Sequence, residues 1–440
     1  MNGGVRGALR TIAAGSVGNV VEWYDWAAYA LMAAVFSKEI FPAHDALTSL
    51  IAALITYAIG FLFRPLGSLI LSPYGDRRGR RGLLSLTILL MGAGSLLLAI
   101  TPSYRAIGVF SPILFLIARI IQGISAGGEF QSSSAYLVEH APTGRRGVIG
   151  SLQLVSIAIA TMVASGVGSL TTGMIPEPAL SAWGWRVPFV IGALIAAYGL
   201  WLRRRAPETP AFEQIEERQE IERQPLRALL RDHWLACLRV VAIQITTVPY
   251  YLWTVFLPTY AHLTSGLPLS EGLLGSTIGL LVFMVTLPVV GHLSDRFGRK
   301  PFLLTTAIGL LVLAYPFFLV LQHATFWPFL GVQIGGLLLL ACVDGVMAAT
   351  FCELFPTRVR ASGIGVPYAL TAAVFSGTAP LIATFFISAG QPIAIAWYVM
   401  AVCVFAGVMF AQMPETRGRS LTDPEPGGET GAGAAAVRSA

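Results

Sequence analysis

Long apolar segments separated by short polar loops follow one another through the whole chain. A helix needs about 20 predominantly apolar residues to cross a hydrocarbon core of roughly 30 Å. Twelve segments approach or exceed this length: 12–36, 48–72, 83–101, 108–138, 147–173, 186–203, 235–261, 271–293, 302–321, 327–352, 362–388 and 392–413. The pattern therefore predicts twelve membrane-spanning helices, and the even number places both termini on one side.

Composition agrees with a chain that uses lipid as its solvent. Hydrophobic residues make up 55% of the 440 residues and charged residues only 12%, too little polar surface to cover a water-soluble globule. We expect an all-α membrane protein in the lipid bilayer of the cell membrane.

Two segments differ from the spans. Residues 204–234 mix glutamates with arginines, which favours a short solvated helix joining two halves; a regulatory docking site is the alternative. The segment 414–440 is rich in Gly, Ala and Pro and is predicted to be a disordered tail. The N-terminal bundle would then cover 1–203 and the C-terminal bundle 235–413.

A charged hexamer with the pattern Asp-Arg-x-Gly-Arg-(Arg/Lys) occurs at 76–81 and again at 295–300, each time between two apolar spans. A second pattern, Glu-x-x-Pro-Thr-x-x-Arg, recurs at 139–146 and 353–360 at nearly the same separation. The repeats therefore indicate that one half of a membrane protein was duplicated, with each basic loop at the same place in its half.

Basic residues decide the orientation of the chain, because loops rich in Lys and Arg stay in the cytoplasm. The two hexamer loops, the loop with Arg145 and Arg146, and the start of the linker all fall on one side. Both termini are therefore expected to be cytoplasmic. The net charge of +6 follows from this bias, and nucleic-acid binding is not needed to explain it.

The hexamers have a mechanical interpretation as a cytoplasmic gate. An aspartate at the turn can cap the following helix and bind arginines across the loop. The alternative is that the loops only anchor the topology, but anchoring alone would not require a fixed order of Asp, Gly and Arg. The predicted gate residues are Asp76, Arg77, Gly79, Arg80, Asp295, Arg296, Gly298 and Arg299.

Six ionisable side chains fall inside predicted spans: Glu22, Asp25, Arg64, Arg119, Glu129 and Asp344. Each unpaired group would cost roughly 2.5–3.5 kcal/mol on an insertion scale. These groups must therefore pair with one another or line a wet cavity.

The first span carries two of these carboxylates three residues apart. Helical spacing places Asn19, Glu22 and Trp26 on one stripe, with Asp25 and Tyr29 on an adjoining one. One interpretation is that the carboxylates only neutralise arginines. Because Arg64 and Arg119 compensate them only in part, the other is that at least one exchanges a proton.

The fourth span can share one polar face among Arg119, Gln122 and Glu129. An arginine there can hold a substrate carboxylate through two parallel hydrogen bonds, or it can simply neutralise a carboxylate of the first span. Arg64 has two alternative roles, one structural and one in substrate binding. Asp344 either stabilises helix packing or belongs to the proton path.

The candidate site residues therefore form two sets. The candidates for proton coupling are Glu22, Asp25 and Glu129, and those for substrate binding are Asn19, Trp26, Tyr29, Arg64, Arg119 and Gln122. Trp23, Tyr24, Trp26 and Tyr29 are expected mainly to pack, although aromatic faces can also hold a quaternary ammonium group. Tyr250, Tyr251 and Trp253 could supply the opposite wall.

Enzymatic and metal sites have no support in the pattern. The four cysteines lack metal-ligand spacing, and the six histidines are scattered without a nucleophile beside them. We expect no cofactor, no metal and no enzyme activity.

In these motifs the chain resembles the major facilitator superfamily and, within it, the metabolite:proton symporters. The loop signature G-x-x-x-D-R-x-G-R-R fits from Gly291 to Lys300, whereas the first copy has Ser72 at the glycine position. The symporter resemblance rests on further motifs: Gly18-Asn19 with Glu22-Trp23-Tyr24-Asp25, Arg64-Pro65-Leu66-Gly67, Gln122-Gly123 with Gly127-Gly128-Glu129, Trp183-Gly184-Trp185-Arg186-Val187-Pro188-Phe189 and Glu208-Thr209-Pro210-Ala211-Phe212.

This resemblance implies two six-helix bundles around a central cavity and proton-driven uptake by alternating access. It implies a small carboxylate or zwitterion as substrate, such as alpha-ketoglutarate, citrate, shikimate, proline or glycine betaine. Our working hypothesis is that Arg119 binds the substrate carboxylate while protonation of Glu22 or Asp25 removes a competing negative charge. A uniporter or exchanger on the same fold is the alternative.

Overall fold

The computed structural model describes residues 2–67, 71, 80–128, 134, 137–138, 141–142, 144–204, 233–355, 360–419 and 421. Within these ranges the chain is helical apart from short turns and contains no β-strand. The fold is that of an all-α membrane protein with two six-helix bundles.

Six long helices form the N-terminal half: α1 (Asn2–Ile40), α2 (Ala46–Leu62), α4 (Arg80–Ile100), α6 (Phe110–Ser125), α8 (Arg146–Met174) and α10 (Val187–Arg204). The short pieces of this half are α5 (Tyr104–Ile107), η1 (Ala126–Gly128), α9 (Glu177–Ala182) and η2 (Gly184–Arg186). In the C-terminal half the helices are α13 (Trp234–Gln244), α14 (Thr247–Tyr251), η3 (Leu252–Phe256), α15 (Leu257–Ser265), α16 (Leu269–Phe297), α17 (Lys300–Leu321), α18 (Phe326–Leu354), α19 (Arg360–Thr371), η4 (Ala372–Ser376), α20 (Ala379–Ser388) and α21 (Ala394–Gln412).

Each of the twelve predicted spans corresponds to a helix or a continuous helical run. Over the described ranges, nine runs are long and apolar enough to cross a membrane. Ser85–Ile100 and Phe110–Ser125 are shorter apolar helices, because the chain around them is described only in part. The remaining span is α1, which carries the two carboxylates of the first predicted span.

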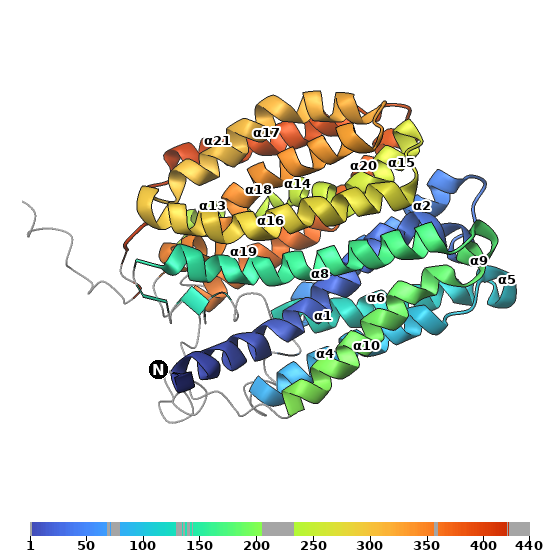
Figure 1. Ribbon diagram of the computed structural model, residues 1–440, viewed down its shortest axis with the longest axis horizontal. Coiled ribbons are helices and arrows are strands. Elements are labelled where there is room, and N and C mark those ends of the chain that lie inside the picture. The colour runs from blue at the N-terminus through green and yellow to red at the C-terminus, as the bar shows by residue number, and fades with distance from the viewer. Residues whose placement is uncertain are drawn as a thin grey trace, which may run out of the picture.

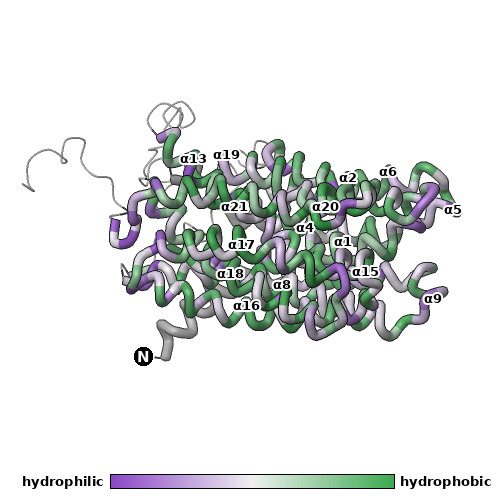
Figure 2. The backbone as a smooth tube through the Cα atoms, turned by 90° about the horizontal axis from the view of Figure 1, so that it is seen from above, coloured by the Kyte–Doolittle hydropathy of each residue, from purple (hydrophilic) through white to green (hydrophobic). Residues whose placement is uncertain are grey.

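Apolar side chains cover the outside of the bundles as well as their core. Leu194, Val285, Val312, Phe385 and Val408 are all at least half exposed. Figure 2 shows hydrophobic residues along the helices and hydrophilic residues largely at their ends. This distribution fits a protein whose flanks face hydrocarbon and whose loops face water.

The two halves meet along paired helices (Figure 1), with α8 lying beside α16 and α2 packing against α20. Gly147 of α8 and Gly291 of α16 touch backbone to backbone, and a Cβ on either residue would collide with the other's carbonyl oxygen. Small residues allow membrane helices to approach this closely. The glycine that opens the second loop motif is thus a contact point between the halves.

Two helices of the C-terminal half contain a π-helical turn, η3 between α14 and α15 and η4 before α20. Pro258 follows η3 and Pro380 follows η4. A proline lacks the N–H that an α-helix requires and clashes with the carbonyl one turn earlier; a widened turn accommodates it. The break lies directly after Tyr250 and Tyr251.

The segment after α21 differs from the prediction at its start. Residues 414–419 were expected to begin a disordered tail, but their polar groups bind the loop between α16 and α17 and the first residue of α8. Composition does not reveal such specific contacts. The linker after 204 and the remainder of the tail lie outside the described residues, except residues 233–234 and 421.

Candidate functional site

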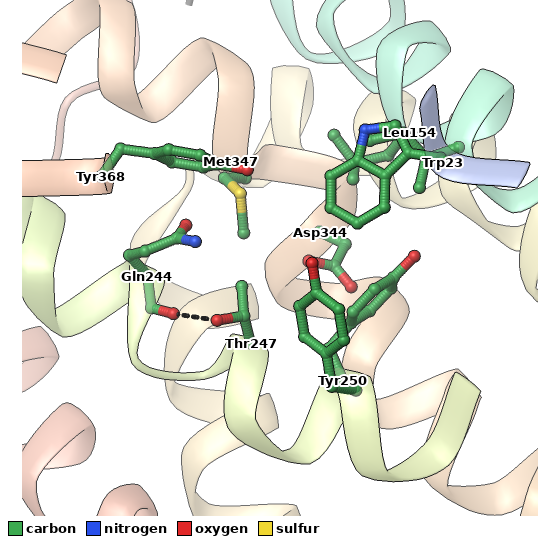
Figure 3. Close-up of a pocket in the computed structure, with 10 residues that line it drawn as sticks. Trp23, Leu154, Gln244, Thr247, Tyr250, Asp344, Met347 and Tyr368 are labelled. Carbon is green, nitrogen blue, oxygen red and sulfur yellow. Dashed lines mark hydrogen bonds between the residues drawn. The ribbon is translucent and has the colours of Figure 1, made fainter. Parts of the chain in front are cut away.

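A small cavity of about 20 Å³ lies between the two halves. It is lined by Trp23, Leu154, Ile157, Gln244, Thr247, Tyr250, Tyr251, Asp344, Met347 and Tyr368. Figure 3 shows the Asp344 carboxylate between Trp23 and Tyr250, with Gln244 and Tyr368 on the other side. Only the first three lining residues come from the N-terminal half.

Aromatic rings form a continuous wall of this cavity across the interface. The rings of Trp23 and Tyr251 lie 6.0 Å apart at an angle of 36°. Tyr250 and Tyr251 meet edge to face at 5.6 Å. These spacings are typical of favourable aromatic pairs, so the wall is built from both α1 and α14.

A buried ion pair lies directly behind Trp23. Arg64 Nη2 is 3.4 Å from Glu22 Oε1, and both side chains are almost fully buried. The Arg64 guanidinium also lies 4.1 Å from the ring centre of Phe61 and 5.6 Å from that of Trp23. A buried arginine is tolerated where a counter-charge and aromatic faces replace water.

A second charged set lies deeper in the N-terminal half and is joined by hydrogen bonds. Arg119 Nη1 donates to Gln122 Oε1 at 2.6 Å, and Gln122 Nε2 donates to Ser95 Oγ at 3.1 Å. The Ser95 hydroxyl donates in turn to Asp25 Oδ2. The opposite charges of Arg119 and Asp25 are therefore connected through two neutral side chains and make no direct contact.

Aromatic rings surround Arg119 on its other sides. Its guanidinium lies 3.9 Å from the Trp26 ring, 4.5 Å from the Tyr29 ring and 5.3 Å from the Tyr57 ring. Nε and Nη2 have no hydrogen-bond partner among the described residues. Arg119 thus keeps donors available, but it does not line the cavity.

None of the six predicted substrate residues is among those that line the cavity. Asn19 donates to Ser156 Oγ at 2.9 Å, and the Tyr29 hydroxyl donates to Ala53 O at 3.0 Å. Trp26 packs against Phe61 and Tyr57. The neighbouring Trp23, expected mainly to pack, is the residue of this stretch that reaches the cavity.

Several lining residues had no assigned role in the sequence pattern: Gln244, Thr247, Met347 and Tyr368. Gln244 and Thr247 are polar positions within an apolar span, and this signal could have identified them. Tyr250 and Tyr251 do form the opposite wall, whereas Trp253 points into the C-terminal half. Its indole N–H donates to Val332 O at 3.1 Å.

The second loop motif marks what we call the basic end of the molecule, the end that carries Asp295 and Arg299. Asp295 was expected to cap the helix that follows it, α17. Instead its carboxylate accepts hydrogen bonds from Gly147 N at 2.8 Å and Val148 N at 3.1 Å, at the start of α8. Asp295 therefore caps a helix of the other half, and Glu415 caps α17 through Arg299 N and Lys300 N.

Arg299 connects the groups of the basic end. It bonds Asp295 Oδ1 at 2.9 Å and forms a two-pronged pair with Glu353, at 3.3 Å from Nε and 3.2 Å from Nη2. Burial alone would lower the pKa of Arg299, but the adjacent carboxylates of Glu353 and Asp295 outweigh it and raise the pKa. Arg299 therefore stays charged.

Gly298, the residue that follows α16, leaves room for the carboxylate of Glu415. Gly298 has a φ of 93°, and a Cβ there would collide with the Glu415 carboxylate. Burial raises the pKa of Glu415, but backbone N–H groups, those of Arg299 and Arg417 first, outweigh it and hold the pKa below its ordinary value.

Some predicted residues cannot be placed. The proton-coupling candidate Glu129 and the gate residues Asp76, Arg77 and Gly79 lie outside the described residues, as does the side chain of Arg80. Arg296 is exposed, and its carbonyl accepts a hydrogen bond from Arg417. Among the predicted gate residues, the side chains that can be placed are therefore those of the second copy.

Two helical bundles with a cavity between them and buried charges beside it define a membrane transporter of small molecules, not an enzyme. The sequence matches the Major Facilitator Superfamily over residues 15–366 and 270–438. The chain belongs to this superfamily.

Relatives with different substrates are about equally similar in sequence. The proline/betaine transporter of Salmonella typhimurium strain LT2 is 34% identical over 96% of this chain and 86% of its own length. The alpha-ketoglutarate permease of Escherichia coli K12 is 32% identical over 91% and 92%, and the citrate-proton symporter of Klebsiella pneumoniae is 34% identical over 87% and 86%.

A solved structure supports the fold at lower sequence identity. The xylose transporter of E. coli, in a partially occluded inward-open conformation, superposes with a TM-score of 0.74 and 19% identity. The match covers 94% of this chain and 99% of that one.

Proposed function

We propose that the protein is a proton-coupled symporter that imports a small organic carboxylate or zwitterion through the cavity between its halves. The observation that carries the proposal is the buried pair of Glu22 and Arg64, which lies behind the cavity wall at Trp23. A proton on Glu22 neutralises the partner of Arg64. The guanidinium is then free to attract a substrate carboxylate.

The position of Arg64 favours it over Arg119 for contact with the substrate. The Arg64 guanidinium lies 5.6 Å from the ring centre of Trp23, which lines the cavity. The rings nearest to Arg119 are Trp26, Tyr29 and Tyr57, and none of these lines the cavity. We therefore assign the carboxylate contact to Arg64.

Asp25 is proposed as a second protonation site that works through the chain to Arg119. A proton on Asp25 would remove the charged acceptor of the Ser95 hydroxyl. The hydrogen bonds from Gln122 to Ser95 and from Arg119 to Gln122 would then weaken, and Arg119 would be held less firmly. Proton and substrate then favour the same closed state, which is the thermodynamic requirement for coupled transport.

We further propose that the basic end is cytoplasmic and forms the inner gate. The excess of Arg and Lys in its loops supports this orientation. Its contacts between the halves, from Asp295 to α8, must break before a path from the cavity can open at that end.

Uptake into proteoliposomes under an imposed pH gradient tests the proposal. A radiolabelled panel of alpha-ketoglutarate, citrate, shikimate, proline and glycine betaine should contain at least one solute that accumulates. Accumulation should disappear with an uncoupler; accumulation that an uncoupler leaves unchanged would contradict proton coupling.

The variant Glu22→Gln separates coupling from binding. It should lose the dependence of uptake on the pH gradient while retaining exchange of internal for external substrate, which needs no net proton movement. Glu39→Gln, in the same helix but away from the cavity, is the matched control. A uniporter or exchanger would show no solute-dependent alkalinisation outside intact cells.

A further inference from the structure

The Asp344 carboxyl group is buried on the C-terminal wall of the cavity. It is 2% exposed, and its Oδ2 has no hydrogen-bond partner among the described residues. Other buried carboxylates have side-chain partners: Glu22 faces Arg64, Asp25 accepts from Ser95 through Oδ2 although its Oδ1 has no hydrogen-bond partner among the described residues, and Glu353 binds Arg299. Asp344 differs from them because what it faces is the cavity.

The groups around this carboxylate are aromatic. Figure 3 shows Trp23 and Tyr250 on either side of Asp344, and Tyr251 continues the wall at 6.0 Å from the Trp23 ring. Ring faces attract cations, and several rings beside one carboxylate make the kind of cage that holds quaternary ammonium groups. An ammonium group would also gain from an ionised Asp344, whereas a second carboxylate would be repelled.

Positive and negative charge lie on different walls of the cavity. Arg64 belongs to the N-terminal wall behind Trp23, and Asp344 belongs to the C-terminal wall. This arrangement is complementary to a small molecule with one negative and one positive end.

We propose that Asp344, with Trp23, Tyr250 and Tyr251, is the binding site for an ammonium group, so that the cavity takes a zwitterion whose carboxylate faces Arg64. The inference rests on the proposed transport through this cavity and narrows its substrate class. Dicarboxylates and tricarboxylates are excluded, because Asp344 would repel their second charge.

Equilibrium binding to the purified full-length protein in detergent tests the assignment, since it requires neither a proton gradient nor transport. The two probes are glycine betaine and 3,3-dimethylbutanoate, which has the same shape and carboxylate but carbon in place of the charged nitrogen. The wild-type protein should prefer glycine betaine by roughly 10- to 100-fold, the range expected for one charge-assisted contact.

Asp344→Asn should remove this preference and leave the affinity for 3,3-dimethylbutanoate within about twofold. Asp344→Glu should retain part of it, which shows that the charge matters and that the variants are folded. Asp45→Asn, the same substitution at an exposed carboxylate outside the cavity, should leave the preference unchanged.

Three results would overturn the assignment. One is a wild-type protein that binds both probes equally, and another is a preference that survives in Asp344→Asn. The third is exchange of betaine in proteoliposomes at the wild-type rate by Asp344→Asn. Asp344 would then bind a proton and not the ammonium group of the substrate. Failure of the proposed function has a different signature: the preference would remain, but uptake would ignore the pH gradient.

Discussion

Replacing Asp295 by alanine should open the basic end of the protein. The Asp295 carboxylate accepts hydrogen bonds from Gly147 N and Val148 N of the other half and pairs with Arg299. When the halves separate there, water takes over these donors. The loss of Asp295 therefore penalises the closed arrangement and leaves the open one almost unchanged.

The size of the effect follows from the number of bonds. Removing an N-cap side chain costs about 1 kcal/mol, within a range of about 0.5–2 kcal/mol. Asp295 satisfies two backbone donors and also carries an ionised contact with Arg299, so about 2 kcal/mol is reasonable. Arg299 retains Glu353 and Ser294 as partners, which limits the loss. A change of about 2 kcal/mol shifts an equilibrium roughly 30-fold.

A native cysteine can report this shift. Cys352 of α18 is buried, and its Sγ lies 4.0 Å from Ser134 O in the N-terminal half. With Cys237, Cys342 and Cys403 replaced by alanine, a permeant maleimide should label Cys352 up to about 30-fold faster in Asp295→Ala. Asp45→Ala removes an N-cap of α2, a cap formed within one half, and should not change the rate.

The reasoning fails if Asp295→Ala keeps the wild-type labelling rate while its thermal stability shows a folded protein. It also fails if Asp45→Ala accelerates labelling equally, because the effect would then reflect general loosening.

Three further predictions concern single contacts. Gly147→Ala should destabilise the closed basic end by about 1–3 kcal/mol, since a Cβ there meets Gly291 O. Labelling of Cys352 should therefore become faster. Gly166→Ala is the control and should not change the labelling rate, because its Cβ would lie 3.7 Å from Thr277. Glu415→Gln should increase tryptic cleavage at Arg417 several-fold at pH 7. Because the folded pKa of Glu415 lies below its ordinary value of 4.5, the wild-type anchor should be fully present above that pH and lost only as the pH falls through the lowered pKa; loosening between pH 6 and 8 would contradict this. Arg64→Lys keeps the charge but loses the flat contact with Phe61 and Trp26, so uptake should fall about tenfold; wild-type uptake would remove Arg64 from the site.

The helices were predictable because lipid requires long apolar runs, and their number and order follow from counting such runs. Buried charges were predictable as a set for the same reason. Their partners were not: helical spacing places Arg119 and Asp25 on faces of their own helices, but it cannot show that Gln122 and Ser95 connect them.

Contacts between the two halves could not be predicted from the sequence. Asp295 was expected to act within its own loop, and only the packing of α16 against α8 shows that it caps the other half. The role of Glu415 was hidden in a segment whose composition indicates disorder. The cavity wall was found only in part, because Gln244 and Tyr368 stand alone in apolar spans.

The unequal lining of the cavity has a consequence for how such a protein diversifies. Seven of the ten lining residues belong to the C-terminal half, while the two ion-linked sets around Arg64 and Arg119 belong to the N-terminal half. Under the proposed mechanism, substitutions among the seven C-terminal lining residues can change which solute is recognised while leaving both charged sets of the N-terminal half intact.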